Sequence, residues 1–207
     1  MKTLNKKIIV LSLAMLLISF NQIQAQTEKV AQIDKYAKSI SALMKKQKER
    51  IFADVASDGE RANWKEFKTE KLREKADKGD NLNENAYVWL KNNKVVGTTF
   101  TNQSPSRDWA QYVTYYYREN GTLAKAESTH NTFYGNVTIR RFYYFNSKGK
   151  MLKQSVKYYD LNTQKPINPK DRELESEIIS DEVTFYKTTD KLAFIKLLQK
   201  TPTRKKR

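Results

Sequence analysis

The chain of 207 residues has no cysteine, a single histidine and only six glycines, which all stand apart from one another. Without cysteine there are no disulfides, thiolate metal sites or lipid-anchored cysteines, so core packing alone must stabilise the fold. One histidine excludes a multi-histidine zinc site and makes a hydrolase triad difficult to build. His130 lies in the polar stretch ESTHNTFYGN, where we expect a solvated loop residue. Isolated glycines also exclude a glycine-rich phosphate-binding loop.

The first 25 residues, MKTLNKKIIVLSLAMLLISFNQIQA, combine a basic start, an apolar centre and a small residue, Ala25, at the end. This layout is typical of a secretory signal peptide, and its apolar centre is shorter than the roughly 20 residues of a membrane-spanning helix. An uncleaved anchor is the alternative, because Ile23 stands where a small residue is favoured. We therefore expect residues 1–25 to direct export to the periplasm or the extracellular space, with no transmembrane segment left after cleavage.

Basic residues outnumber acidic ones by 39 to 23, which gives a formal charge of +16. The predicted signal peptide holds three of the basic residues and none of the acidic ones, which leaves +13, and residues 201–207 form a basic tail. Such a charge attracts anionic polymers over a Debye length of roughly 8 Å at physiological salt. The lysines are scattered and no helix-turn-helix or RNP pattern appears, so no nucleic-acid partner is expected.

Helical periodicity characterises residues 27–78. Apolar residues from Thr27 to Phe52 fall three and four positions apart, which predicts a long amphipathic helix. Its apolar stripe consists of Val30, Ile33, Ala37, Ile40, Met44 and Ile51. The segment SDGE is a capping-box pattern, which predicts a second, surface helix that ends near Lys78.

From Asn85 onward the composition changes to β-branched and aromatic residues, and one pattern recurs with a period of 28 residues. Asn93, Gly121 and Gly149 mark its three repeats. Aromatic or apolar residues precede each position and an apolar residue follows it, as in YYYRENGTL and FYYFNSKGKM. Because Asn and Gly adopt the positive φ of a tight turn at little cost, the repeats predict three β-hairpins within residues 86–187.

The last segments complete the predicted fold. DLNTQKPINPKD contains two prolines that interrupt regular structure, EVTFYK from Glu182 predicts a final strand, and residues 189–199 predict a short helix. We therefore predict a single α+β domain over residues 26–200. Its long N-terminal amphipathic helix packs on an antiparallel β-meander of about six strands, and a short C-terminal helix follows.

Nine of the twelve tyrosines lie between Tyr112 and Tyr159, and alternate residues of a strand point to opposite faces of a sheet. One parity contains Tyr115, Tyr117, Tyr143 and Phe145, which we predict to form the core under the long helix. The other parity contains the candidate ligand-binding residues Tyr112, Tyr116, Arg140, Phe142 and Tyr144. Tyrosine combines apolar area with a hydroxyl, so this face suits a glycan, a peptide or a partner protein. The alternative is a face without a ligand, either solvated or covered by the C-terminal helix.

No metal or cofactor site is expected. The segment DRELESEIISDE clusters acidic residues whose geometry nothing fixes, and a solvated segment that balances the basic remainder is the simpler interpretation. DKGDNLNEN is not an EF-hand loop, because Leu82 occupies the sixth position, where the turn needs glycine. A hydrolase that uses carboxylates such as Asp108, Asp160 or Glu182 is an alternative function.

The units YYYRENGTLAK and FYYFNSKGKMLK resemble the aromatic, glycine-turn, apolar, lysine hairpins of bacterial MORN-variant repeat proteins. Their flanks, SRDWAQYVTYYYRENGTLA and TFYGNVTIRRFYYFNSKGKMLKQSVKYYDLNTQKP, also resemble uncharacterised exported bacterial proteins. The resemblance covers the chain from Tyr87 to Pro166. It implies β-hairpins and contact with protein or lipid, and it carries over no catalytic residue.

These observations lead to three hypotheses of function. The first is an exported, non-catalytic binding or interaction protein of the bacterial envelope, whose tyrosine-rich face binds an unknown protein, a glycan or an anionic envelope polymer. The second is the carboxylate-dependent hydrolase. The third is a periplasmic helper or inhibitor protein that docks a partner by an edge strand.

Overall fold

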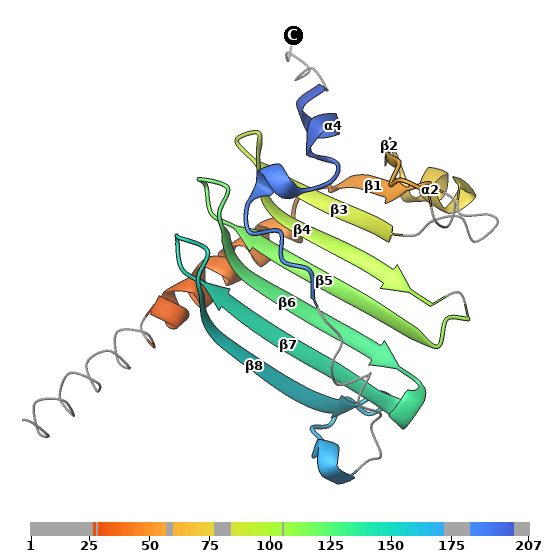
Figure 1. The fold of residues 1–207 in the computed structure, drawn as a ribbon, viewed down its shortest axis with the longest axis vertical. Coiled ribbons are helices and arrows are strands. Elements are labelled where there is room, and N and C mark those ends of the chain that lie inside the picture. The colour runs from red at the N-terminus through yellow and green to blue at the C-terminus, as the bar shows by residue number, and fades with distance from the viewer. Residues whose placement is uncertain are drawn as a thin grey trace, which may run out of the picture.

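One antiparallel sheet of eight strands dominates the protein, in the order β2-β1-β3-β4-β5-β6-β7-β8 (Figure 1). The computed structural model describes residues 27, 29–56, 60–76, 84–104, 106–171 and 183–200. The predicted signal peptide, the basic tail and residues 172–182 of the acidic segment lie outside these ranges. The strands are β1 (Arg50–Asp54), β2 (Trp64–Phe67), β3 (Glu84–Lys91), β4 (Lys94–Gln103), β5 (Trp109–Tyr117), β6 (Leu123–Thr132), β7 (Val137–Phe145) and β8 (Met151–Asp160).

Strands β3 to β8 follow one another along the chain, and each pairs with the next to form a meander. The three hairpins predicted from the 28-residue repeat are confirmed. Asn93 (φ 60°) lies in the β3–β4 turn, Gly121 (φ 81°) in the β5–β6 turn and Gly149 (φ 76°) in the β7–β8 turn. Asn and Gly tolerate this left-handed backbone better than other residues, which explains why they stand where the chain reverses.

The predicted fold class is wrong, because the sheet has eight strands instead of about six and the described residues form only a few helices, most of them short. The first described helix ends at residue 44, and two segments that were expected to be helical form β1 and β2. Strand β1 lies between β2 and β3 and is buried on both faces, so four successive residues are buried without alternation. A continuous buried run such as Ile51 to Ala53 lacks the two-residue alternation that identifies a strand. In the sequence it therefore looked like a continuation of the helical pattern that precedes it.

Apart from the helix over residues 29–44, the described helices are short. They are α2 (Glu70–Ala76), α4 (Ile195–Lys200) and the 3-10 turns η1 (Tyr134–Asn136), η2 (Pro169–Asp171) and η3 (Thr189–Lys191). The strand expected from Glu182 is wrong, because residues 183–187 form no strand. The predicted C-terminal helix is divided into η3 and α4. Within the described ranges, no helix is both long enough and apolar enough to cross a membrane.

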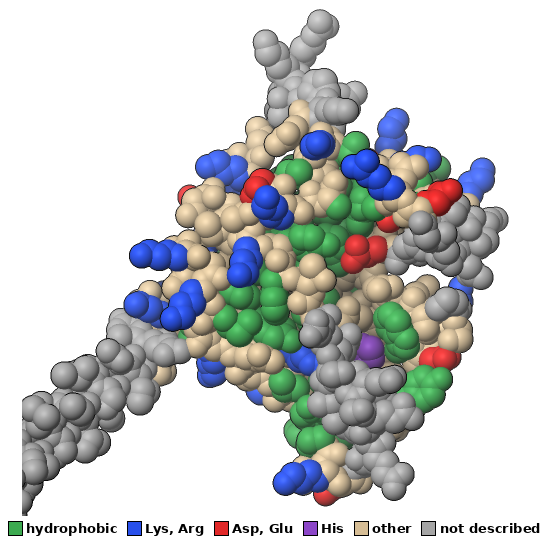
Figure 2. All heavy atoms as spheres, in the orientation of Figure 1, with side chains coloured by type: hydrophobic (Ala, Val, Ile, Leu, Met, Phe, Trp, Pro, Cys, Tyr) green, Lys and Arg blue, Asp and Glu red, His purple; other side chains and the backbone are tan. Residues whose placement is uncertain are grey.

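The C-terminal segment, residues 183–200, covers the face of the sheet that is turned toward the viewer in Figure 1. Phe194 is fully buried there and stacks on Phe52 of β1, with the ring centroids 4.8 Å apart. Figure 2 shows hydrophobic side chains gathered in the middle of this C-terminal-side face, with lysines and arginines around them. The main core therefore lies between the sheet and the last described residues.

Tyrosine hydroxyls fix the C-terminal segment to the sheet. Tyr115 donates a hydrogen bond to the carbonyl oxygen of Thr184 at 2.5 Å, and Tyr117 donates to that of Tyr186 at 3.1 Å. The predicted core residues Tyr115, Tyr117, Tyr143 and Phe145 all lie in this core, which confirms their parity. The prediction that the long helix covers them is wrong, because the C-terminal segment occupies that side.

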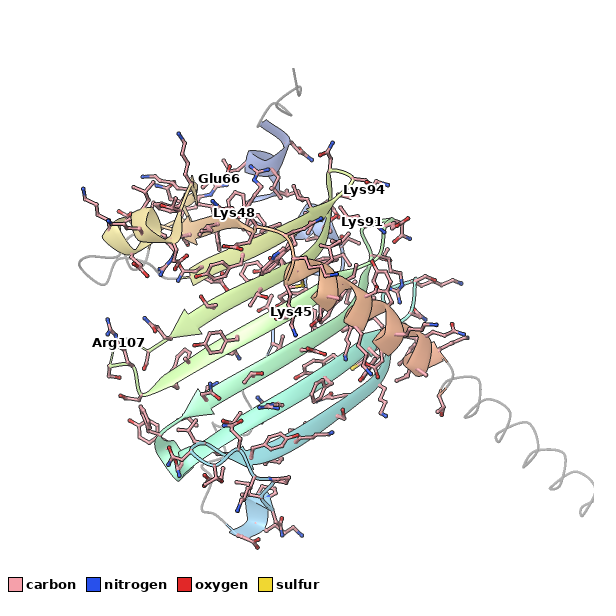
Figure 3. The ribbon with its side chains drawn as sticks, turned by 180° about the vertical axis from the view of Figure 1, so that it is seen from behind. Lys45, Lys48, Glu66, Lys91, Lys94 and Arg107 are labelled. Atoms are coloured by element: carbon pink, nitrogen blue, oxygen red, sulfur yellow. The ribbon has the colours of Figure 1, made fainter. Side chains whose placement is uncertain are left out.

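The helix of residues 29–44 crosses the opposite, helix-side face of the sheet at the end where the three hairpin turns lie (Figure 3). Ile33 packs near Tyr144, and Ile40 packs near Tyr116. The helix approaches β4 closely at Gly97, where an added Cβ would lie 2.8 Å from Met44 Sδ. The other half of this face, away from the turns, is not covered by any described helix (Figure 3).

Candidate binding surface on the helix-side face

Side chains of neighbouring strands line up in rows across the helix-side face, because paired residues of an antiparallel sheet point to the same face. The covered row runs under the helix and ends at the exposed Lys153; it is Gly97, Tyr116, Lys125, Tyr144 and Lys153. The middle row is Thr99, Thr114, Glu127, Phe142 and Ser155. The outer row is Thr101, Tyr112, Thr129, Arg140 and Lys157. The five candidate residues are therefore divided among three rows: two lie in the covered row, one in the middle row and two in the outer row.

Tyr116 and Tyr144 pack against the helix and are only 4% and 7% exposed. The Tyr116 hydroxyl lies 3.1 Å from Ser41 Oγ and donates to Glu127 Oε2 at 3.0 Å. Tyr144 donates to the Asp34 carboxylate at 3.1 Å. Burial, and then the charge of Glu127, raises the pKa of Tyr116 to about 12. Both hydroxyls are thus engaged within the protein, and they hold the helix on the sheet.

Lys125, between these two tyrosines, is the centre of a buried ionic network. Its Nζ lies 2.5 Å from Asp34 Oδ1 and 2.7 Å from Glu127 Oε1. The same atom lies 5.4 Å from the ring centroid of Phe142 and 5.0 Å from that of Tyr144. Burial alone would lower the pKa of Lys125, but the hydrogen bonds to the two carboxylates outweigh burial and raise it. Lys125 therefore stays charged at physiological pH and connects the helix to β6.

Two candidate residues, Tyr112 and Arg140, lie in the outer row and stay at least partly accessible. Tyr112 is 43% exposed. Its hydroxyl and those of Thr101 and Thr129 make no hydrogen bond to any described residue. The Arg140 guanidinium lies 4.6 Å from the ring centroid of Tyr159, and this contact fixes its position. Its positive charge is thus held two strands away from Tyr112. This row therefore presents an aromatic ring, free hydroxyls and a fixed cation side by side.

The middle row forms the border between the covered and accessible parts. Thr99 and Thr114 share a hydrogen bond of 2.9 Å between their hydroxyls. Phe142 is partly buried, and two ammonium groups lie near its ring, with Lys125 Nζ at 5.4 Å and Lys157 Nζ at 6.0 Å from its centroid. The middle row thus adds an aromatic ring to the surface, while its threonine hydroxyls are already paired.

Sequence reasoning missed part of this surface and misplaced His130. Thr129 was assigned to a link between hairpins, but β6 continues to Thr132 and includes both Thr129 and His130. His130 is buried on the C-terminal-side face and stacks on Trp109, with ring centroids 5.6 Å apart. The expectation of a solvated loop histidine is wrong. No alternation of apolar and polar residues marks this part of β6 in the sequence, because residues 127–132 (ESTHNT) are all polar.

The carboxylates considered for hydrolysis serve turns. Asp108 Oδ2 accepts a hydrogen bond from Ser106 Oγ at 2.6 Å, and Asp160 Oδ1 accepts one from the Thr163 backbone N–H at 2.8 Å. Glu182 lies outside the described residues. In the described part of the chain, no group of three or more His, Asp or Glu side chains is arranged to hold a metal ion. This geometry gives the hydrolase hypothesis no support.

One carboxylate pair that sequence reasoning did not consider lies on the C-terminal-side face. Asp54 of β1 and Glu84 of β3 stand directly opposite each other. Asp54 Oδ1 accepts hydrogen bonds from the backbone N–H groups of Ala56 at 3.1 Å and Asn63 at 2.7 Å. Burial, and then the charge of Asp54, raises the pKa of Glu84 from 4.5 to about 7. The pair was hidden because β1 was expected to be helical.

Comparison of the chain with models of known protein families, with curated proteins and with solved structures found no match. The resemblance to MORN-variant repeats therefore stays a prediction, and the geometry of the surface must carry the functional argument.

Proposed function

We propose that this chain is an exported, non-catalytic binding protein that holds an acidic polysaccharide of the cell envelope or exterior across the outer row. The observation that carries this proposal is the row itself, in which Tyr112, the hydroxyls of Thr101 and Thr129, and the cations Arg140 and Lys157 occupy one register line across five strands. The function hypothesis drawn from the sequence is kept, and its site moves toward the accessible half of the face.

The dimensions of the row suit an extended ligand. Neighbouring strands lie about 4.8 Å apart, so the four steps from Thr101 on β4 to Lys157 on β8 span about 19 Å. A chain of sugars lying across the strands meets a new side chain at each step. A compact ligand of a few atoms would use only a fraction of this length.

The chemistry of the row favours a polysaccharide over a peptide. The hydroxyls of Thr101, Tyr112 and Thr129 make no bond to described residues, so they are available to sugar hydroxyls, and the exposed ring of Tyr112 offers apolar area for the face of a sugar. Arg140 and Lys157 add positive charge for carboxylate groups. Two cavities among the described residues lie at the hairpin turns, away from the outer row.

The test uses polygalacturonate as the acidic probe and dextran as the neutral one, with affinity measured by calorimetry. Tyr112→Ala leaves the net charge unchanged, and we expect it to weaken polygalacturonate binding by about tenfold, which corresponds to roughly 1.4 kcal/mol. The matched control is Tyr134→Ala, at an exposed tyrosine in η1, which should bind as the unmodified chain does.

Arg140→Gln should weaken polygalacturonate binding and leave dextran binding unchanged, because it removes a charge and keeps hydrogen-bonding groups. Equal affinities of the unmodified chain, Tyr112→Ala and Arg140→Gln for polygalacturonate would refute the outer row as the site. An equal loss in Tyr134→Ala would show that the effect is not located there.

A second candidate function is docking of a partner protein to the edge of the sheet. Strand β8 has ten residues and pairs with β7 on one side. On its other side, the end of β8 pairs with residues 165–167. Tyr159 bridges to Pro166, the Ile167 N–H donates to the carbonyl oxygen of Tyr158 at 3.0 Å, and the Asp160 N–H donates to that of Lys165 at 2.9 Å. From Lys153 to Lys157 the backbone of β8 has no hydrogen-bond partner on this side within the described part of the chain, so this stretch is open to strand addition. Val156→Pro would abolish such docking, whereas Tyr112→Ala would leave it intact.

A further inference from the structure

A cavity of about 520 Å³ lies on the helix-side face, at the opposite end from the outer row. Its walls come from the first turns of the helix and from the β5–β6 and β7–β8 turns. Six of the lining residues carry the argument: Lys29, Ile33, Tyr36, Arg118, Lys148 and Leu152. The volume falls in the range of about 300 to 1,000 Å³ that is usual for small-molecule sites.

The cavity is positively charged. Lys29, Arg118 and Lys148 line it, and no aspartate or glutamate does. None of the three forms an ion pair with a carboxylate in the described chain, in contrast to Lys125 in the covered row. An anion that enters the cavity therefore meets three cations whose charge no described carboxylate neutralises.

Arg118 is held in a fixed position at this site. Its Nη1 donates to the carbonyl oxygen of Leu123 at 2.6 Å, and its Nη2 donates to that of Phe145 at 2.5 Å. Both acceptors are neutral, so these bonds orient the guanidinium without cancelling its charge. Partial burial lowers the pKa of Arg118, which reflects a cation deprived of part of its hydration. A preorganised and poorly hydrated cation is a favourable partner for an anion.

Another part of the lining is apolar. Ile33 of the helix, Ala124 of β6 and Leu152 of β8 line the cavity, and the ring of Tyr36 lies among them. The Tyr36 hydroxyl is already engaged, because it donates to the carbonyl oxygen of Tyr117 at 2.5 Å. Tyr36 therefore offers its ring more than its hydroxyl to a ligand.

We propose that this cavity binds a small organic anion, in which a carboxylate or phosphate group contacts Lys29, Arg118 and Lys148 and an apolar body lies against Ile33 and Leu152. The site is separate from the outer row, and the inference does not depend on the polysaccharide proposal. It assigns the chain a second ligand class, recognised by one charged head and one apolar tail.

The experiment uses the full-length chain and three probes: octanoate, the neutral 1-octanol and inorganic phosphate. Calorimetry measures affinity, and backbone amide NMR shifts of Ser147 and Leu152 locate binding. In the charge variant, Lys29→Gln and Lys148→Gln are combined. In the control, Lys45→Gln and Lys48→Gln are combined; both lysines are exposed near the other end of the helix (Figure 3), so the two variants carry the same net charge.

We expect octanoate to bind and to shift the Ser147 and Leu152 signals, and we expect the charge variant to raise the dissociation constant about tenfold. The control variant should bind octanoate as the unmodified chain does. If 1-octanol bound as tightly as octanoate, the cations would not contribute to recognition. If inorganic phosphate bound as tightly as octanoate, Ile33 and Leu152 would not contribute to binding. Either result would refute the proposal. An equal loss of octanoate affinity in the control variant would show that the effect comes from net charge alone, and it would refute the site.

Discussion

The Glu84 and Asp54 carboxylates provide a test of how burial on the C-terminal-side face controls stability. The pKa of Glu84 is raised from 4.5 to about 7 in the folded protein. The folded state therefore binds a proton more tightly at Glu84 than the unfolded state does. The contribution of the protonated Glu84 to stability is fully present below about pH 4.5 and is lost as the pH rises through about 7.

The size of this effect follows from the shift. Each unit of pKa is worth about 1.36 kcal/mol, so a shift of this size corresponds to roughly 3 kcal/mol between about pH 4.5 and pH 8. Replacing Glu84 by Gln removes the titration and keeps the shape of the side chain. The difference in unfolding free energy between Glu84→Gln and the unmodified chain should therefore move in favour of the variant by about 3 kcal/mol over this pH range.

Urea unfolding, followed by tryptophan fluorescence at four pH values between about 4.5 and 8, measures this difference directly. The matched control is Glu74→Gln, at an exposed glutamate of α2, whose difference from the unmodified chain should stay constant with pH. A Glu84→Gln difference that also stays constant would refute the argument, because it would mean that folding leaves the proton affinity of Glu84 unchanged.

Two further substitutions test the two sides of the sheet by the same unfolding assay. Lys125→Met leaves Asp34 and Glu127 without their cation. Because these carboxylates are about one third exposed, we expect the free energy of unfolding to fall by about 2 to 3 kcal/mol. Lys153→Met, in the same row, should change it little. Phe194→Ala empties a fully buried site on Phe52 and should cost about 3 to 5 kcal/mol, whereas Phe133→Ala, at a ring 71% exposed, should cost less than about 0.5 kcal/mol. Equal losses within either pair would contradict the packing described above.

The hairpins were predictable because their signals are local. The turns require a positive φ at Asn93, Gly121 and Gly149, and this requirement does not depend on the neighbouring residues. The parity of Tyr115 and Tyr117 was predictable for the same reason, since a strand has a period of two. Strand β1 was not, because burial on both faces removes the alternation that identifies a strand, and the helical stripe before it continued into Ile51.

The choice of which segment covers which face depends on contacts between residues far apart in the chain. Both faces of the meander carry tyrosines near the hairpin turns, so either could have received the helix. The sequence located Tyr112 and Arg140 on one face, and it did not reveal that the helix would cover Tyr116 and Tyr144 of the same set. The accessible part of the candidate site was therefore identified only in three dimensions.

The placement of the last described residues has a consequence for synthesis of the protein. Leu192 and Phe194 complete the main core, and they are among the final residues that the ribosome adds to the described chain. A nascent chain that has reached only β8 exposes the aromatic rings that these residues later cover. Such a chain is prone to aggregation until these residues have been added. Folding of the main core therefore waits until residues 183–200 have been synthesised.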